Sequence, residues 1–121
     1  MTYSEGRSYC QAIGGDLGVV DDSKLSSFLN GYLYWTQKVW IGLKDAAQLN
    51  DFHSFYWVSG EVASSYTDWG VQSHNSKHDC VLIQKNYGVY NWINVACNDT
   101  AWVLCEFGNK NIAQCVLYFG T

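Results

Sequence analysis

The spacing of hydrophobic residues predicts two helices near the start of the chain. Thr2 and Glu5 have the spacing of a capping box, in which a hydroxyl and a carboxylate satisfy backbone N–H groups at the start of a helix. Apolar residues then share one helical face until glycines at positions 14 and 15 end the pattern. Over residues 22–32 apolar residues recur at the i, i+3, i+4, i+7 spacing of a second amphipathic helix.

After residue 34 the pattern changes to short apolar runs. Such runs, bounded by turn residues, are too short for helices and are typical of buried strands. A polar stretch over residues 59–78 interrupts them, and a loop of that length inside a compact domain is usually functional. Helices followed by strands around a long irregular loop predict an α+β domain. The predicted strands cover residues 39–43, 55–58, 80–84, 102–107 and 115–119.

Composition narrows the class of protein. A chain of 121 residues has the length of a single domain. Because 48% of its residues are apolar and only 15% are charged, the composition excludes a disordered protein. The net charge of -4, without a basic cluster, argues against nucleic acid as a partner. No apolar run is long enough to insert into a membrane. Aromatic residues reach 17%, which we interpret as the filling of a small core.

The cysteines indicate an oxidising environment. Five cysteines in a short chain are typical of a secreted or extracellular protein. None forms a CxxC pair, so a disulfide framework is favoured over a zinc knuckle. Because five is odd, at least one cysteine is free or pairs with another molecule, and the residues alone leave every pairing open. Asn98 starts an Asn-Asp-Thr acceptor for N-glycosylation, which also suits secretion.

Several short motifs follow one another along the chain: Tyr3-Ser4-Glu5-Gly6 with Cys10, Gly14-Gly15-Asp16-Leu17, Trp40-Ile41-Gly42-Leu43, Trp57-Val58-Ser59-Gly60, Trp69, Asp79-Cys80-Val81, Trp92 with Cys97, and Cys105-Glu106-Phe107. Together they resemble one known family, the C-type lectin-like domains. The resemblance implies a single such domain over residues 1–121, with two helices, small antiparallel sheets and a long irregular binding loop. It also implies a recognition module rather than an enzyme. Each motif is weak alone, but their order and spacing together are specific.

The resemblance also implies a disulfide pairing and an unusual strand order. It pairs Cys10 with Cys105 and Cys80 with Cys97, which leaves Cys115 free or intermolecular. Family members carry a strand before the first helix that is similar to residues 115–121 of this chain. Residues 109–121 are therefore expected to be that strand, either circularly permuted or exchanged with a neighbouring molecule. An excerpt from a tandem array is a further alternative.

Sugar-binding members of the family hold a calcium ion in the long loop through acidic and amide side chains. Ca²⁺ requires six to eight oxygen ligands, several of them anionic. Here neutral residues occupy the equivalent positions, and a shift of one residue in the first triplet does not restore an acid. We therefore expect the usual calcium site to be lost. The residues at these positions are Ser73, His74, Asn75, His78, Ile93 and Asn94, of which Asn75 and Asn94 still offer an oxygen.

Other side chains near the loop are further candidates. His74 and His78 are candidate zinc ligands, although the plainer interpretation is that they are solvated loop residues. Tyr87 and Tyr90 flank Gly88 in a predicted hairpin tip and are candidate exposed contacts for a ligand. No other cofactor is indicated.

Two functions remain open from the sequence. The first is an extracellular lectin that binds a glycan without the usual calcium site, and the polar loop favours it. The alternative is a protein-binding domain in which Cys115 links two copies as a disulfide-bonded homodimer. An enzyme is not expected, because Cys115 is the only unassigned thiol and no histidine lies within about thirty residues of it.

Overall fold

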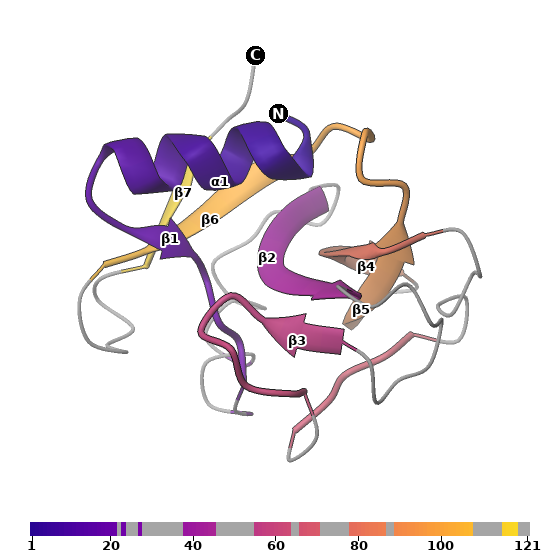
Figure 1. Ribbon diagram of the computed structural model, residues 1–121. Coiled ribbons are helices and arrows are strands. Elements are labelled where there is room, and N and C mark those ends of the chain that lie inside the picture. The colour runs from indigo at the N-terminus through magenta and orange to yellow at the C-terminus, as the bar shows by residue number, and fades with distance from the viewer. Residues whose placement is uncertain are drawn as a thin grey trace.

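The computed structural model describes residues 1–21, 23, 27, 38–45, 55–63, 66–70, 78–86, 89–107 and 115–118. For residues 85, 86, 89 and 115–118 the description is of the backbone alone. Within these ranges helix α1 lies across a twisted sheet (Figure 1).

Helix α1 spans Tyr3–Ala12 and begins as the capping box predicts. The Glu5 backbone N–H donates to the Thr2 hydroxyl at 3.3 Å, and the Thr2 N–H donates to the Glu5 carboxylate at 2.9 Å. The helix buries Tyr3, Gly6 and Cys10 against the sheet. Gly14 follows with a φ of 98°, a left-handed conformation that glycine adopts without a Cβ penalty, and the chain turns there into the first strand.

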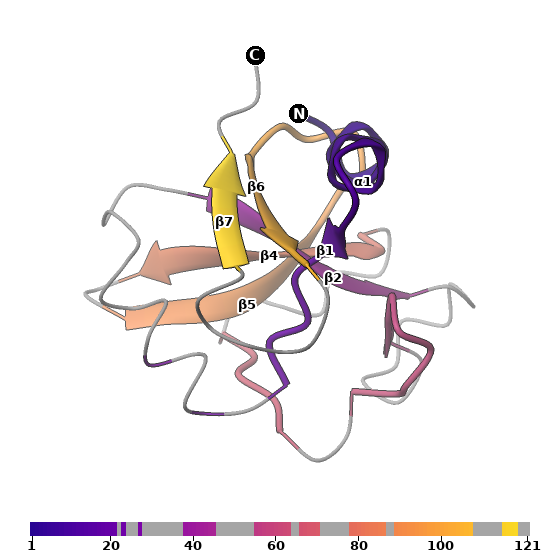
Figure 2. The same ribbon diagram turned by 90° about the vertical axis from the view of Figure 1, so that its left-hand side faces the viewer.

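Seven strands form one sheet in the described residues, with the order β1-β6-β2-β4-β5. Strand β3 pairs with β2, and β7 pairs with the free edge of β6 (Figure 2). Every pair is antiparallel except β2 with β6, and this parallel pair joins what we expected to be separate small sheets. The strands are β1 Asp16–Leu17, β2 Lys38–Asp45, β3 Phe55–Trp57, β4 Cys80–Asn86, β5 Val89–Val95, β6 Trp102–Glu106 and β7 Cys115–Tyr118.

The five predicted strands are all confirmed, with ends that differ by one or two residues. Strand β1 was not predicted, and for β5 the sequence indicated only the hairpin tip before it, without bounds for the strand. Of the predicted second helix, only Ser23 and Ser27 are described, and both are helical. The remainder of that helix lies outside the described residues and stays a prediction.

Side chains alternate between two apolar clusters on the two faces of the sheet. On β2, for example, Trp40 joins the cluster beneath α1, whereas Val39 and Ile41 join the cluster on the other face. The indole N–H of Trp40 donates to the carbonyl of Met1 at 2.9 Å, which holds the start of the chain against the sheet. The aromatic residues therefore fill the core, as the composition predicts; the buried indoles are those of Trp40, Trp57 and Trp92.

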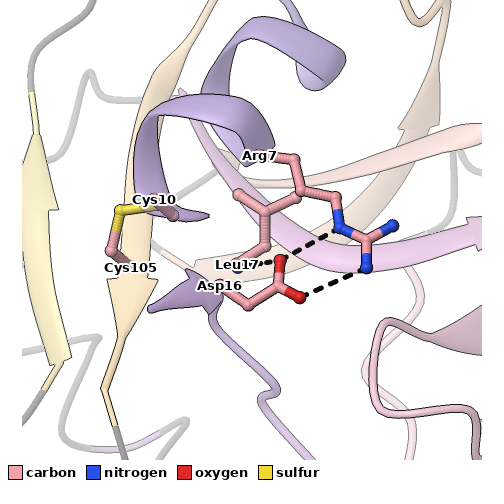
Figure 3. Close-up of a disulfide and its surroundings, with 5 residues drawn as sticks. All are labelled: Arg7, Cys10, Asp16, Leu17 and Cys105. Carbon is pink, nitrogen blue, oxygen red and sulfur yellow. Dashed lines mark hydrogen bonds and ion pairs between the residues drawn. A yellow bond between two sulfur atoms is a disulfide. The ribbon is translucent and has the colours of Figure 1, made fainter. Parts of the chain in front are cut away.

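Both predicted disulfides are confirmed. Cys10 on α1 bonds to Cys105 on β6, with their Cα atoms 5.4 Å apart (Figure 3). Cys80 at the start of β4 bonds to Cys97 just after β5, with a Cα separation of 5.1 Å. The first bridge ties the helix to the centre of the sheet, and the second closes the β4–β5 hairpin at the end where the polar loop arrives.

Strand β7 runs antiparallel along the outer edge of β6, and Tyr118 lies opposite Val103. The amino group of Met1 donates to the carbonyl of Ala101 at 3.1 Å, just before β6 begins. The last residue of β7 and the first residue of the chain therefore both lie beside the start of β6.

Candidate functional site

The base of the polar loop is built by the β4–β5 hairpin. Asn94 on β5 lies opposite Val81 and is only 2% exposed. Its side-chain amide donates to the backbone carbonyl of His78 at 2.8 Å, which ties the end of the loop to the sheet. Three of the predicted binding residues, Ser73, His74 and Asn75, lie outside the described residues.

A cluster of aromatic side chains packs beneath the same region. The ring centroids of Trp69 and Trp92 are 5.5 Å apart, and Trp57 packs edge-on against Trp92 at 5.4 Å. The backbone N–H of Gly70 donates to the Trp92 carbonyl at 2.9 Å, and the Trp92 N–H donates to the Asp68 carbonyl at 2.8 Å. These contacts anchor the chain at the point where it enters residues 71–77. Trp92 is buried in the core, and Trp69 packs against the core while partly exposed.

One predicted contact residue is corrected by the structure. Tyr90 is 3% exposed and packs in the same core cluster as Trp92, so the prediction that it presents an exposed face is wrong. The reason is the period of two along a strand, which places residues 90, 92 and 94 on one face. Burial also raises the pKa of the Tyr90 hydroxyl. Tyr87, the other predicted contact, lies outside the described residues.

A partly buried acid, Asp68, lies at the edge of the loop. Burial raises the pKa of the Asp68 carboxyl, and a hydrogen bond from the side-chain amide of Asn91 at 3.2 Å offsets part of this shift. Asp68 and Asn91 thus form a polar pair beside the aromatic cluster. This pair was not singled out from the sequence, because it depends on β5, which was not predicted as a strand.

In the described ranges, no three side chains of the His, Cys, Asp or Glu types come together as a group that could hold a metal ion. His78 is half-buried just before β4, and its proposed zinc partner His74 is outside those ranges. The loss of calcium and the binding of zinc both stay predictions. Asn98 is exposed in the turn that follows Cys97, so it is accessible as a glycosylation acceptor.

Comparison with known proteins agrees with this architecture. The pattern of the Lectin C-type domain family matches residues 1–107. Collectin-11 of Danio rerio is 26% identical over 112 residues, which cover 91% of this chain and 40% of Collectin-11. The chain therefore spans less than half the length of this relative.

Solved structures show the same fold. Human lithostathine superposes with a TM-score of 0.75 at 28% identity, covering 89% of this chain and 85% of lithostathine. The C-type lectin domain of murine dendritic cell inhibitory receptor 2, solved in complex with an N-glycan, superposes with a TM-score of 0.73 at 20% identity, covering 83% and 77% of the two chains.

Proposed function

Because the chain belongs to the family of C-type lectin domains, we propose that it is an extracellular carbohydrate-recognition domain that needs no calcium at the family's usual position. The family is a non-enzymatic carbohydrate-recognition fold, which agrees with the expectation that the chain is not an enzyme. No helix in the described part of the chain is long and apolar enough to cross a membrane.

The environment of Asn94 is the main observation in favour of recognition without calcium. The resemblance to the family expects an acidic calcium ligand at this position, but the side chain here is a neutral amide. It is almost completely buried, and it donates a hydrogen bond to the carbonyl of His78. An amide that holds the loop to the sheet in this way supplies no negative charge to a cation. Since Ca²⁺ is held by several anionic oxygens, the neutral amide at this position favours recognition without it.

The extracellular location is supported by the two disulfides. Bridges such as Cys10–Cys105 and Cys80–Cys97 persist in oxidising compartments and are rare in the cytosol. The exposed acceptor at Asn98 suits the same location. The polar composition of residues 59–78 favours a hydroxyl-rich ligand such as a glycan over an apolar one.

A glycan array tests the proposal. The protein is applied once with added Ca²⁺ and once with EDTA, and we expect the same glycans to bind in both conditions. A double variant of the loop, Ser73→Ala with Asn75→Ala, should lose this binding. Asn98→Gln is the matched control, because Asn98 is an exposed amide remote from the loop in sequence, and it should bind as the parent does. Binding that appears only with Ca²⁺, or no binding in either condition, contradicts the proposal.

The same array with added Zn²⁺ tests the two histidines. If His74 and His78 hold zinc, the metal should change the set of bound glycans, and His74→Ala should abolish the change. Identical patterns with and without Zn²⁺ contradict a role for the metal.

A further inference from the structure

A small hollow lies beside α1, away from the polar loop. It is open to solvent and has a volume of about 210 Å³. Five of its six lining residues come from the helix and one from β2, and each carries a hydrogen-bonding side chain. We call it the α1–β2 hollow; its lining is Tyr3, Ser4, Arg7, Ser8, Gln11 and Lys44. A cavity with this lining suits a polar group with several oxygen atoms.

The charges around the hollow leave one positive charge in excess. The guanidinium of Arg7 pairs with Asp16 at 3.0 and 3.2 Å, and its remaining nitrogen points away from that carboxylate (Figure 3). The ammonium of Lys44 lies 5.7 Å from the ring centroid of Tyr3 and has no carboxylate partner among the described residues. Two cations against one anion favour a ligand that carries a negative charge.

An exposed aromatic side chain stands next to the hollow. Tyr56 on β3 lies directly opposite Lys44 on β2, so both side chains project from the same face of the sheet. Tyr56 is 44% exposed, whereas its neighbours Phe55 and Trp57 are buried on the opposite face. Val62, which is 37% exposed, pairs with Tyr56 across an isolated bridge and extends the apolar surface.

Together these features suit a sugar ring, which presents both an apolar face and polar oxygen atoms. A flat aromatic surface accepts the apolar C–H face of the ring, while adjacent hydroxyl, amide and cationic groups bind its oxygen atoms. From this geometry we infer that the α1–β2 hollow and Tyr56 form a second, metal-free site for an acidic saccharide unit that carries a sulfate or carboxylate group. The site goes beyond the function proposed above, since Tyr56 and the residues that line the hollow all lie outside residues 59–78.

Titrations with small probes in EDTA test the site. The probes are N-acetylglucosamine 6-sulfate, glucuronic acid, N-acetylglucosamine and sodium sulfate. Binding of each is measured from changes in the NMR chemical shifts of the protein. We expect the two acidic sugars to bind at least about tenfold more tightly than the neutral sugar, because a charged acceptor strengthens each hydrogen bond. Sodium sulfate should bind more weakly than the sulfated sugar, because it makes no contact with Tyr56. The preference between the two acidic sugars tells which acidic group the hollow accepts.

Two substitutions of exposed residues separate the contributions. Lys44→Gln should weaken the acidic sugars about tenfold and leave the neutral sugar unchanged. Tyr56→Ser should weaken all three sugars and leave sodium sulfate unchanged. Lys38→Gln is the matched control, because Lys38 is also exposed on β2 but lies at its other end, outside the hollow. It should behave as the parent does, and circular dichroism should confirm that all three variants are folded.

Several outcomes overturn the inference. An equal loss in Lys38→Gln and Lys44→Gln indicates diffuse electrostatic attraction rather than a site. Sodium sulfate that binds as tightly as the sulfated sugar refutes recognition of the sugar ring, and so does a Tyr56→Ser variant that behaves as the parent. The loop variant Ser73→Ala with Asn75→Ala should leave these titrations unchanged, so this site and the proposed loop function fail independently.

Discussion

The two disulfides differ in the length of chain that they close, and this difference predicts their contributions to stability. In the chain-entropy description, a crosslink stabilises the fold by restricting the unfolded chain, with a logarithmic dependence on loop length. Cys10 and Cys105 are 95 residues apart, which gives about 4.7 kcal/mol at 25 °C. Cys80 and Cys97 are 17 residues apart, which gives about 3.1 kcal/mol.

The perturbation is the replacement of each cysteine pair by alanine in a Cys115→Ser background, which prevents exchange with the remaining thiol. Urea denaturation should then show that loss of the Cys10–Cys105 bridge lowers the free energy of unfolding by about 1.5 kcal/mol more than loss of the Cys80–Cys97 bridge. Because domains of this size are stable by only about 5–15 kcal/mol, the first variant should be close to unfolding.

The background variant alone is the control for the measurement. The short loop lies within the long one, so the crosslink at Cys80–Cys97 shortens the outer loop only slightly and the order of the two effects is kept. Equal losses, or a larger loss for the short loop, would refute the entropic account and assign the stabilisation to contacts in the folded state.

Four further predictions address other parts of the molecule. Burial raises the pKa of Tyr3 from 10.0 to about 12, so this hydroxyl ionises first in the unfolded chain. Stability should therefore be complete below about pH 10 and fall towards pH 12 by about 2–3 kcal/mol, and Tyr3→Phe should make this fall shallower in urea titrations. Gly15→Ala would place a Cβ against the Glu106 carbonyl and should cost about 1–3 kcal/mol by thermal unfolding. Gly14→Ala meets open space, but its φ of 98° is left-handed and should cost an L side chain about 1–2 kcal/mol. If Cys115 links two copies, non-reducing electrophoresis shows a dimer band that Cys115→Ser lacks, and a monomeric parent contradicts the link. Moving residues 109–121 ahead of Met1 should preserve both disulfides and the melting temperature, and an unfolded product would refute the permuted arrangement.

Local signals explain which elements were predictable. The capping box of Thr2 and Glu5 involves residues three apart, and it is present as predicted. The apolar runs of β2 and β4 are buried on both faces, so they stand out in the sequence without any knowledge of their partners. The pairing of Cys10 with Cys105 joins residues 95 apart, and only the resemblance to a known family selected it.

Strand β5 escaped prediction because it mixes polar and apolar residues on both faces. Asn91 and Ile93 alternate with Trp92 and Asn94, so no apolar period of two is visible. The position of Trp92 in the core could still have located Tyr90, which lies two residues earlier on the same face. The α1–β2 hollow was not predictable either, since the register of β2 with β3 brings Lys44 beside Tyr56.

The pairing along the edge of β6 explains why the position of β7 in space matters more than its position in the sequence. One side of β6 pairs with β1 and β2, and the other side pairs with β7 along residues 103–106. Without β7, that side would present unpaired N–H and C=O groups, which invite association with another chain. Because Tyr118 lies opposite Val103 and Met1 bonds to Ala101, a strand placed before α1 could reach this edge as readily as one placed after β6. We therefore propose that a strand at this edge completes the fold, and that either order of the chain can provide it.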